Sequence, residues 1–131
     1  KVKALAQLSN GCLRVRAGTG SNLSWESWSE IAAKRDAGIK VQVQWTRVKP
    51  PERALEKLLR SYDCEVSRLV DCCRESLFFR RAGDLVRCLE AVCGDGEIAV
   101  RRVKNRMDPA VDVTNSGGFR FVVVNLCVVS R

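Results

Sequence analysis

Histidine is absent from this chain of 131 residues, and its absence excludes a large part of enzyme chemistry. Without an imidazole the protein has no serine or cysteine triad, and no zinc site that needs a histidine ligand. No apolar run approaches the roughly 18 residues of a membrane-spanning helix, and no secretory signal pattern opens the sequence. We therefore expect a protein without a membrane partner.

Methionine is scarce: the single one is Met107, and the sequence begins at Lys1. We expect an excised domain, a processed form or a fragment of a longer protein. Hydrophobic residues make up 46% and charged residues 29%, which is typical of a folded chain. The length predicts one domain over residues 1–131. Its core is expected within about residues 24–129, and residues 1–20 form an N-terminal segment without a clear pattern.

Cysteine is present seven times, and no pair has the C-x-x-C spacing. The adjacent Cys72 and Cys73 would point to opposite faces of a strand, so they cannot easily share a metal ion. Most of the cysteines lie in apolar segments. They are interpreted as small buried hydrophobic residues of an intracellular protein in a reducing compartment, either the cytoplasm or an organelle lumen.

Acidic side chains are outnumbered: 23 lysines and arginines face 15 aspartates and glutamates, for a net charge of +8. Such a balance favours polyanionic partners, namely nucleotides, nucleic acid such as RNA, or an anionic surface. The alternative is that the charge serves solubility alone.

Hydrophobic periodicity predicts the secondary structure. Apolar and polar residues alternate from Ile39 to Thr46, which indicates a strand with one buried face. Pro51 at a first helical position predicts a helix over residues 51–62. Ser24 is expected to cap a helix that ends before Gly38. Strands are expected at residues 40–48, 75–80, 97–104 and 119–129, and two of the helices at residues 51–62 and 82–93. This order predicts the α/β or α+β class, with one mixed sheet of about four strands flanked by helices.

Three segments resemble the RelA/SpoT-like alarmone synthetase domains. The stretch "RVKPPERALEKLLRSY" is similar to the family's R-x-K-x-x-x-S junction between a strand and a helix. The stretch "SRLVDCCRESLFFRRAGDLVRCLEAV" resembles its next strand and helix. Finally, "VRRVKNRMDP" and "SGGFRFVVVNL" resemble its K-D-Y-I and G-Y-R-S-L-H region. The similarity covers about residues 40–129, in the family's order. It implies a nucleotidyltransferase-like fold that transfers pyrophosphate from ATP to GDP or GTP.

The resemblance also implies a purine-nucleotide site. Its phosphate-binding candidates are Arg47, Lys49, Lys104 and Arg106. Asp71 matches the aspartate that binds Mg²⁺, and Phe119 matches the tyrosine that stacks on the guanine. The structural alternatives are a turn residue at Asp71, solvated cations at the other positions, and a core aromatic at Phe119.

Several positions depart from the family pattern. They are Arg53 for the motif serine, Ser76 for an arginine, Asn105 and Arg106 for the aspartate and tyrosine of K-D-Y-I, and Val123 for the histidine. The strand that supplies the family's second carboxylate would lie beyond Arg131. We therefore expect a degenerate domain that keeps nucleotide or phosphate binding without efficient pyrophosphate transfer. Two other hypotheses stay open: a basic nucleic-acid or ribonucleoprotein-associated module, and an interaction domain whose partner or missing C-terminal segment completes the sheet.

Overall fold

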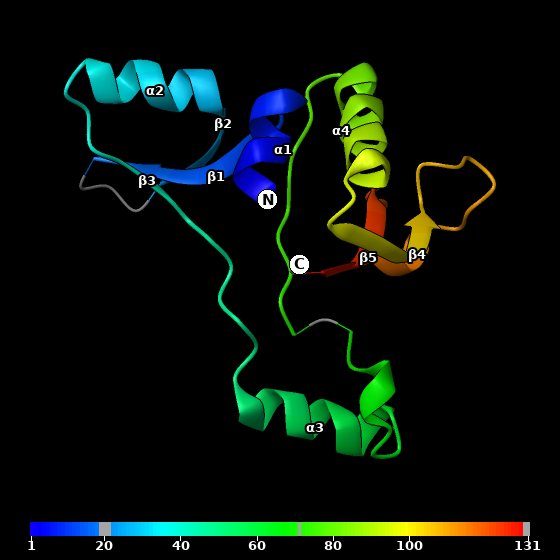
Figure 1. Cartoon of the computed structure of the whole chain (residues 1–131). Coiled ribbons are helices and arrows are strands. Elements are labelled where there is room, and N and C mark those ends of the chain that lie inside the picture. Colours follow the sequence, from blue (N-terminus) through cyan, green and yellow to red (C-terminus); the bar gives the residue numbers. More distant parts are fainter. Residues whose placement is uncertain (19–21, 71, 130–131) are drawn as a thin grey trace. The chain divides into compact units, whose positions relative to one another are not determined.

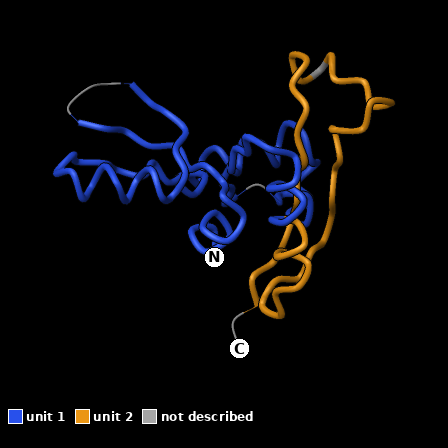
Figure 2. The backbone as a smooth tube through the Cα atoms, turned by 90° about the horizontal axis from the view of Figure 1, so that it is seen from above, with its two compact units in different colours: residues 1–88 blue, residues 89–131 orange. Residues whose placement is uncertain are grey.

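The chain folds into two compact units, which Figure 2 distinguishes by colour: residues 1–88 and residues 89–131. A computed structural model describes residues 1–18, 22–70 and 72–129. In chain order (Figure 1) the elements are α1 (Val2–Leu8), β1 (Cys12–Ala17), β2 (Leu23–Ser27), α2 (Trp28–Asp36), β3 (Val41–Val43), α3 (Pro51–Ser61), the 3₁₀ turn η1 (Val66–Arg68), α4 (Ala82–Gly94), β4 (Ile98–Asn105), the 3₁₀ turn η2 (Thr114–Ser116) and β5 (Val122–Val128). Helices combined with antiparallel strands confirm the predicted α+β class. The single-domain organisation stays a prediction.

Unit 1, residues 1–88, is built on a three-stranded sheet in the order β2-β1-β3, with both pairs antiparallel. One face of this sheet is covered by α1 and α2, which contribute Ala6 and Ile31 to the core. The sheet contributes Leu13, Val15 and Val41 to the same cluster. The central strand therefore belongs to the N-terminal segment, and the predicted core of residues 24–129 omits the residues that anchor it.

The predicted single sheet of about four strands is wrong, because the strands of the described residues form two separate sheets. β3 covers only Val41–Val43, whereas a strand was predicted over residues 40–48. Residues 75–80 form only an isolated bridge, in which Cys12 and Phe78 exchange backbone hydrogen bonds of 2.8 and 3.1 Å. Local periodicity indicated where extended chain occurs, but pairing depends on distant partners that periodicity does not identify.

The helix predicted with Ser24 as its N-cap begins three residues later than predicted, at Trp28 with Ser27 as its N-cap. Ser27 and Glu30 form a capping box in which each side chain accepts from the other residue's backbone N–H. The preceding residues pair with β1 as strand β2, and Ser24 instead donates its hydroxyl to Glu26 at 2.7 Å. The sequence does contain a helix start signal, and it lies at Ser27 instead of Ser24.

Helix α3 confirms the helix predicted over residues 51–62, with Pro51 in its first turn. However, α3 contains no buried residue, and Leu55 and Leu59 are 57% and 59% exposed. α3 therefore does not cover a sheet with a buried apolar face, although helices were predicted to flank the sheet. The second predicted helix, over residues 82–93, is confirmed as α4.

Unit 2, residues 89–131, contains a long antiparallel hairpin formed by β4 and β5. Its strands confirm those predicted at residues 97–104 and 119–129, although β5 begins only at Val122. Gly117 and Gly118 lie just before β5 with φ of +63° and +81°. The backbone of residues other than glycine rarely adopts this left-handed region. The double glycine therefore allows the chain to leave η2 and reverse into β5.

The cysteines are less buried than predicted. Cys12 and Cys88 are buried, whereas Cys72 is half-buried; the exposed ones are Cys64, Cys73, Cys93 and Cys127. All seven are free thiols. Burial raises the pKa of the Cys12 and Cys88 thiols above their usual value, so these two behave as the predicted small hydrophobic residues.

Unit 1 should lose stability in acid, because the ion pair between Arg80 and Glu30 is broken when Glu30 is protonated. Two guanidinium nitrogens of Arg80 donate to the Glu30 carboxylate at 2.9 and 3.0 Å. These bonds, with the Ser27 N–H, lower the pKa of Glu30 from 4.5 to about 2. A lowered folded-state pKa stabilises the fold above the unfolded pKa, and this contribution is lost as the pH falls from 4.5 towards 2.

The measurement is the urea midpoint of unfolding across this pH window for the wild type, Glu30→Gln and Arg80→Gln. We expect both variants to lose less stability than the wild type between the upper and lower ends of the window. Equal losses in all three proteins would show that the pair does not contribute to the pH dependence.

Candidate functional site

The second face of the three-stranded sheet in unit 1 carries polar and aromatic side chains. Along β1, Arg14 and Arg16 alternate with the core residues Leu13 and Val15, so the two arginines point away from the core. We call this surface the open face, and define it by Arg14, Arg16, Leu23, Trp25, Gln42 and Gln44.

The open face consists of two rows that run across the strands. In the first row Arg14 is paired with Trp25 on β2, and the Arg14 carbonyl accepts from the Gln44 N–H at 2.8 Å. In the second row Arg16 is paired with Leu23 and with Gln42. Neighbouring residues on one face of antiparallel strands lie about 4.5–5.5 Å apart at Cβ, so each row forms a continuous surface.

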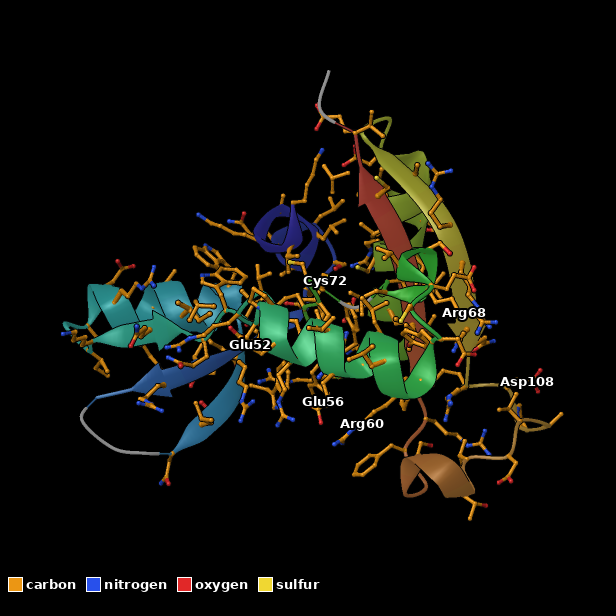
Figure 3. All side chains as sticks on the ribbon, turned by 90° about the horizontal axis from the view of Figure 1, so that it is seen from below. Glu52, Glu56, Arg60, Arg68, Cys72 and Asp108 are labelled. Carbon is orange, nitrogen blue, oxygen red and sulfur yellow. The ribbon has the colours of Figure 1, made fainter. Side chains whose placement is uncertain are left out.

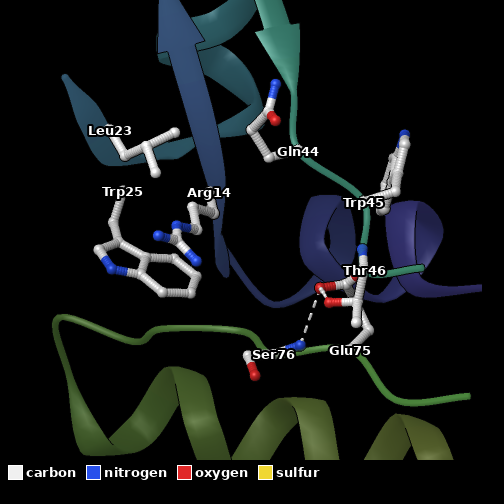
Figure 4. A pocket seen from close by; sticks show the side chains of 8 residues that line it. All are labelled: Arg14, Leu23, Trp25, Gln44, Trp45, Thr46, Glu75 and Ser76. Carbon is white, nitrogen blue, oxygen red and sulfur yellow. Dashed lines mark hydrogen bonds between the residues drawn. The ribbon is translucent and has the colours of Figure 1, made fainter. Parts of the chain in front are cut away.

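A cavity of about 320 Å³ lies on the first row (Figure 4). It is lined by Arg14, Leu23, Trp25, Gln44, Trp45, Thr46, Glu75 and Ser76. Figure 4 shows the Arg14 guanidinium beside the Trp25 indole, with Trp45 on the opposite side of the cavity. The two indoles are 39% and 49% exposed, so each retains a ring surface that a ligand can contact.

One wall of the cavity is held by Glu75. Its carboxylate accepts from the Thr46 N–H at 2.9 Å, from the Thr46 hydroxyl at 3.1 Å and from the Ser76 N–H at 3.0 Å. The two bonds from Thr46 tie the segment after β3 to the segment around Ser76. Figure 4 shows Thr46 beside Glu75. Because the Glu75 oxygens are already engaged by donors, this side chain positions the wall.

The Trp25 indole is supported from within unit 1. Its ring lies 6.2 Å from that of Phe78 at an angle of 41°. Phe78 is in turn fixed by its backbone bridge to Cys12 at the start of β1. An aromatic ring that is packed on one side and exposed on the other loses little conformational freedom when a planar ligand stacks on it.

The cations of the open face have no partner in the part of the chain that the structure describes. Neither Arg14 nor Arg16 makes a side-chain ion pair or hydrogen bond there. Two unpaired guanidinium groups on one strand are available to an anionic ligand, and guanidinium suits phosphate because its nitrogens donate in a planar fork.

The residues predicted from the resemblance are distributed over both units. Arg47 is exposed on the segment between β3 and α3, and Lys49 is half-buried there, with its N–H donating to the Cys72 carbonyl at 2.8 Å. Lys104 is exposed on β4, and Asp71 lies outside the described residues. Since Lys49 and Lys104 belong to different units, their convergence on one site stays a prediction.

Two of the predicted positions are defined in unit 2. Phe119 is 73% exposed, so the alternative that it is a core aromatic is wrong. The Arg106 guanidinium lies over the Phe121 ring, 5.4 Å from its centre. The base-stacking role of Phe119 and the phosphate-binding role of Arg106 both stay predictions.

Lys49 also borders a second hollow, of about 350 Å³, along α3. Its other lining residues are Arg53, Glu56, Lys57, Arg60 and Ser61. Figure 3 labels Glu56 and Arg60 on this helix. Glu56 accepts from Arg53 at 2.9 Å and from Arg60 at 2.8 Å, so one carboxylate serves two of the cations. The hollow is basic, but its arginines are already paired.

The described residues contain neither a cluster of metal ligands nor a membrane-spanning helix. Within residues 1–18, 22–70 and 72–129, no group of three or more cysteine, aspartate or glutamate residues is placed to hold a metal ion. Asp71 lies outside the described residues, so the Mg²⁺ site that the resemblance implies there stays a prediction. No helix of the described chain is both long and apolar enough to cross a membrane.

Comparison with known proteins adds no assignment: no family model, curated protein or solved structure matches this chain. The resemblance to RelA/SpoT-like synthetases stays a prediction. Sequence reasoning missed the open face altogether, because its residues come from three strands. The alternation of "CLRVRA" was the available signal, since it places two arginines opposite two core residues on one strand.

Proposed function

We propose that this chain binds single-stranded nucleic acid on the open face of unit 1. The observation that carries the proposal is the row formed by Trp25, Arg14 and Gln44 at the floor of the cavity. An indole stacks on any unpaired base, a guanidinium neutralises a phosphate, and an amide both donates to and accepts from a base edge. All three functions are needed to hold one nucleotide.

The size and shape of the cavity support an unpaired nucleotide as the ligand. Its volume of about 320 Å³ lies at the lower end of the roughly 300–1,000 Å³ that small-ligand sites occupy. A base within a duplex is stacked on both sides and cannot present its ring to Trp25. Single-stranded segments expose that ring surface, and are therefore the preferred form.

Arg16 and the net charge extend the site beyond one nucleotide. Arg16 lies two residues along β1 from Arg14 on the same face, about 6.6 Å away at the usual rise of a strand. A neighbouring phosphate of the same strand can contact it. The chain's net charge of +8 adds a long-range attraction that raises the association rate of any polyanion.

A mononucleotide at Lys49 is the second candidate function. The observation that favours it is the hollow along α3, where Lys49 and Lys57 lie with two arginines. This candidate corresponds to the degenerate synthetase that the resemblance implies. Purine-nucleotide binding there, without efficient pyrophosphate transfer, stays a prediction. Its ligand is an isolated triphosphate rather than a strand.

The test is fluorescence anisotropy with a labelled RNA of about 12 nucleotides, within the roughly 4–16 that one single-strand-binding module covers. The same sequence is tested as DNA and as a duplex, and unlabelled ATP with Mg²⁺ serves as competitor. We expect the single strands to bind more tightly than the duplex. We also expect ATP to compete poorly, because it offers one base and no continuous backbone.

The variant is Arg14→Gln/Arg16→Gln, and Arg68→Gln/Arg74→Gln removes the same charge from exposed positions elsewhere in unit 1. Each phosphate contact contributes about 0.7 to the slope of log affinity against log salt, so the first variant should lower the slope by about 1.4. The second should keep the wild-type slope. Equal slopes in both variants, a preference for duplex, or no binding at about 50 mM salt would overturn the proposal.

A further inference from the structure

The hairpin of unit 2 contains a bulge that sorts its side chains. Val100 is opposite Leu126 and Arg102 is opposite Asn125, so Arg101 is an extra residue between two consecutive pairs. An extra residue shifts the alternation of all later side chains on that strand by one position. If the same residues were paired regularly, with no bulge, Val100 and Arg102 would lie on the same face of the hairpin.

The shift places the cations of β4 and its valines Val100 and Val103 on opposite faces of the hairpin. Val103 is opposite Val124, which shares its face with Leu126, so Val100 and Val103 lie on the apolar side. Arg102 and Lys104 lie on the other side, opposite Asn125 and Val123. We call the latter the cationic face, and define it by Arg101, Arg102 and Lys104.

The cations of this face are available to a ligand. Arg101, Arg102 and Lys104 are exposed, and their charged groups make no ion pair or hydrogen bond within residues 89–129 or elsewhere in the described chain. The acidic residues nearest in sequence are Glu97 and Asp108, which flank the stretch at its two ends. Three like charges that repel one another on one strand are stabilised when a polyanion neutralises them.

We propose that the cationic face binds the sugar-phosphate backbone of nucleic acid, as a second contact for the strand held on the open face. This inference rests on the proposed function. Alternate residues of a strand are spaced by about 6.6 Å, so the face presents charges in a line, which suits a linear polyanion. Phosphate contacts of this kind add affinity and salt dependence without base preference.

A lipid surface fits this face less well. Interfacial membrane segments combine cations with apolar side chains on the same side, so that the apolar groups enter the bilayer while the cations contact the headgroups. In this hairpin the bulge puts Val100 and Val103 on the side opposite to Arg102 and Lys104. A bilayer that contacts the cations therefore gains no burial of the apolar face.

Two contacts on one chain have a consequence for ligand length. A strand that occupies the open face holds its remaining nucleotides at high local concentration around the cationic face, and linked contacts of this kind raise affinity by about 10²–10⁴-fold when the ligand is long enough to reach both. An oligonucleotide too short to extend from one face to the other contacts only one of them at a time. The affinity for RNA should therefore increase with RNA length more steeply than it would if a longer RNA only offered more positions at which one face could bind.

The experiment compares the wild type with Arg101→Gln/Arg102→Gln/Lys104→Gln, using RNA of about 6 and about 30 nucleotides around the roughly 4–16 covered by one module. A control, Arg68→Gln/Arg74→Gln/Arg81→Gln, loses the same charge from unit 1. Quenching of tryptophan fluorescence reports the open face, whose cavity contains Trp25 and Trp45, while anisotropy and its salt dependence report total binding.

We expect the hairpin variant to quench normally with the short RNA, and to lose about 2 from the salt slope with the long RNA, since each contact contributes about 0.7. Arg101→Lys/Arg102→Lys keeps the charges and should keep the slope.

An unchanged slope in the glutamine variant, with normal quenching, overturns the proposal for the cationic face and leaves the proposal for the open face intact. No quenching or binding by the wild type overturns both. Tighter binding to phosphatidylserine vesicles than to RNA, lost in the glutamine variant, would assign the face to a membrane instead.

Discussion

Leu13→Ala is expected to destabilise unit 1 by about 2–5 kcal/mol, the range observed when a buried leucine is truncated. Leu13 is 1% exposed on the central strand, and packs in one cluster with Val15 and Ile31. Its removal leaves a cavity between the sheet and the helices that cover it. Domains of this size are stable by only about 5–15 kcal/mol, so a large part of the total is at risk.

The measurement is urea unfolding followed by far-ultraviolet circular dichroism, with Leu55→Ala as the matched control. Leu55 lies on α3 with more than half of its surface exposed, and alanine is at least as good a helix former as leucine. We expect the control to change the free energy of unfolding by less than about 0.5 kcal/mol. If Leu55→Ala costs as much as Leu13→Ala, then α3 is packed in solution and the core extends beyond the N-terminal sheet.

Trp25→Ala should lower the affinity for single-stranded RNA by about 1–3 kcal/mol, the usual value of one base stacked on an aromatic side chain. This corresponds to a loss of roughly 5–150-fold in the association constant. The effect should differ in kind from that of the arginine variants. Stacking involves no counterion release, so the salt slope should stay at the wild-type value while the affinity falls.

Two further variants make this test specific. Trp25→Phe keeps an aromatic ring on the open face and should retain most of the affinity. Tyr62→Ala removes an aromatic side chain that does not line the cavity, and should bind as the wild type does. Wild-type affinity in Trp25→Ala, with normal circular dichroism, would show that bases do not stack at this position. A parallel loss in Tyr62→Ala would indicate a non-specific effect.

Elements defined by local chemistry could be predicted from the sequence. Pro51 starts α3, and the leucine spacing of α4 and the apolar run of β5 identify those elements without reference to the rest of the chain. Elements that depend on distant partners could not be predicted from the sequence. β1 was not predicted, because it is a short segment flanked by glycines. Its position as the central strand follows from its pairing with β2 and β3. The fold class was therefore accessible, whereas the division into two sheets was not.

The candidate site shows the same division. Basic residues before α3 and on β4 were recognised because they are close in sequence and resemble family motifs. Arg14, Trp25 and Gln44 are each ordinary in their own segment, and only the strand register brings them into one row. The burial of cysteines was also overpredicted, because an apolar neighbourhood in sequence does not ensure a covered position. Cys127 lies in the apolar strand β5 and is exposed.

The extra residue at Arg101 determines where the hairpin of unit 2 tolerates a change in length. Deletion of Arg101 would remove the bulge but leave Arg102 opposite Asn125 and Val103 opposite Val124, so both residues would keep their faces. Deletion of Val103 would instead bring Arg102 opposite Val124 if the rest of the register held, and would place a cation on the apolar face. During evolutionary drift, a residue should therefore be lost more readily at Arg101 than at the positions that follow it on the strand.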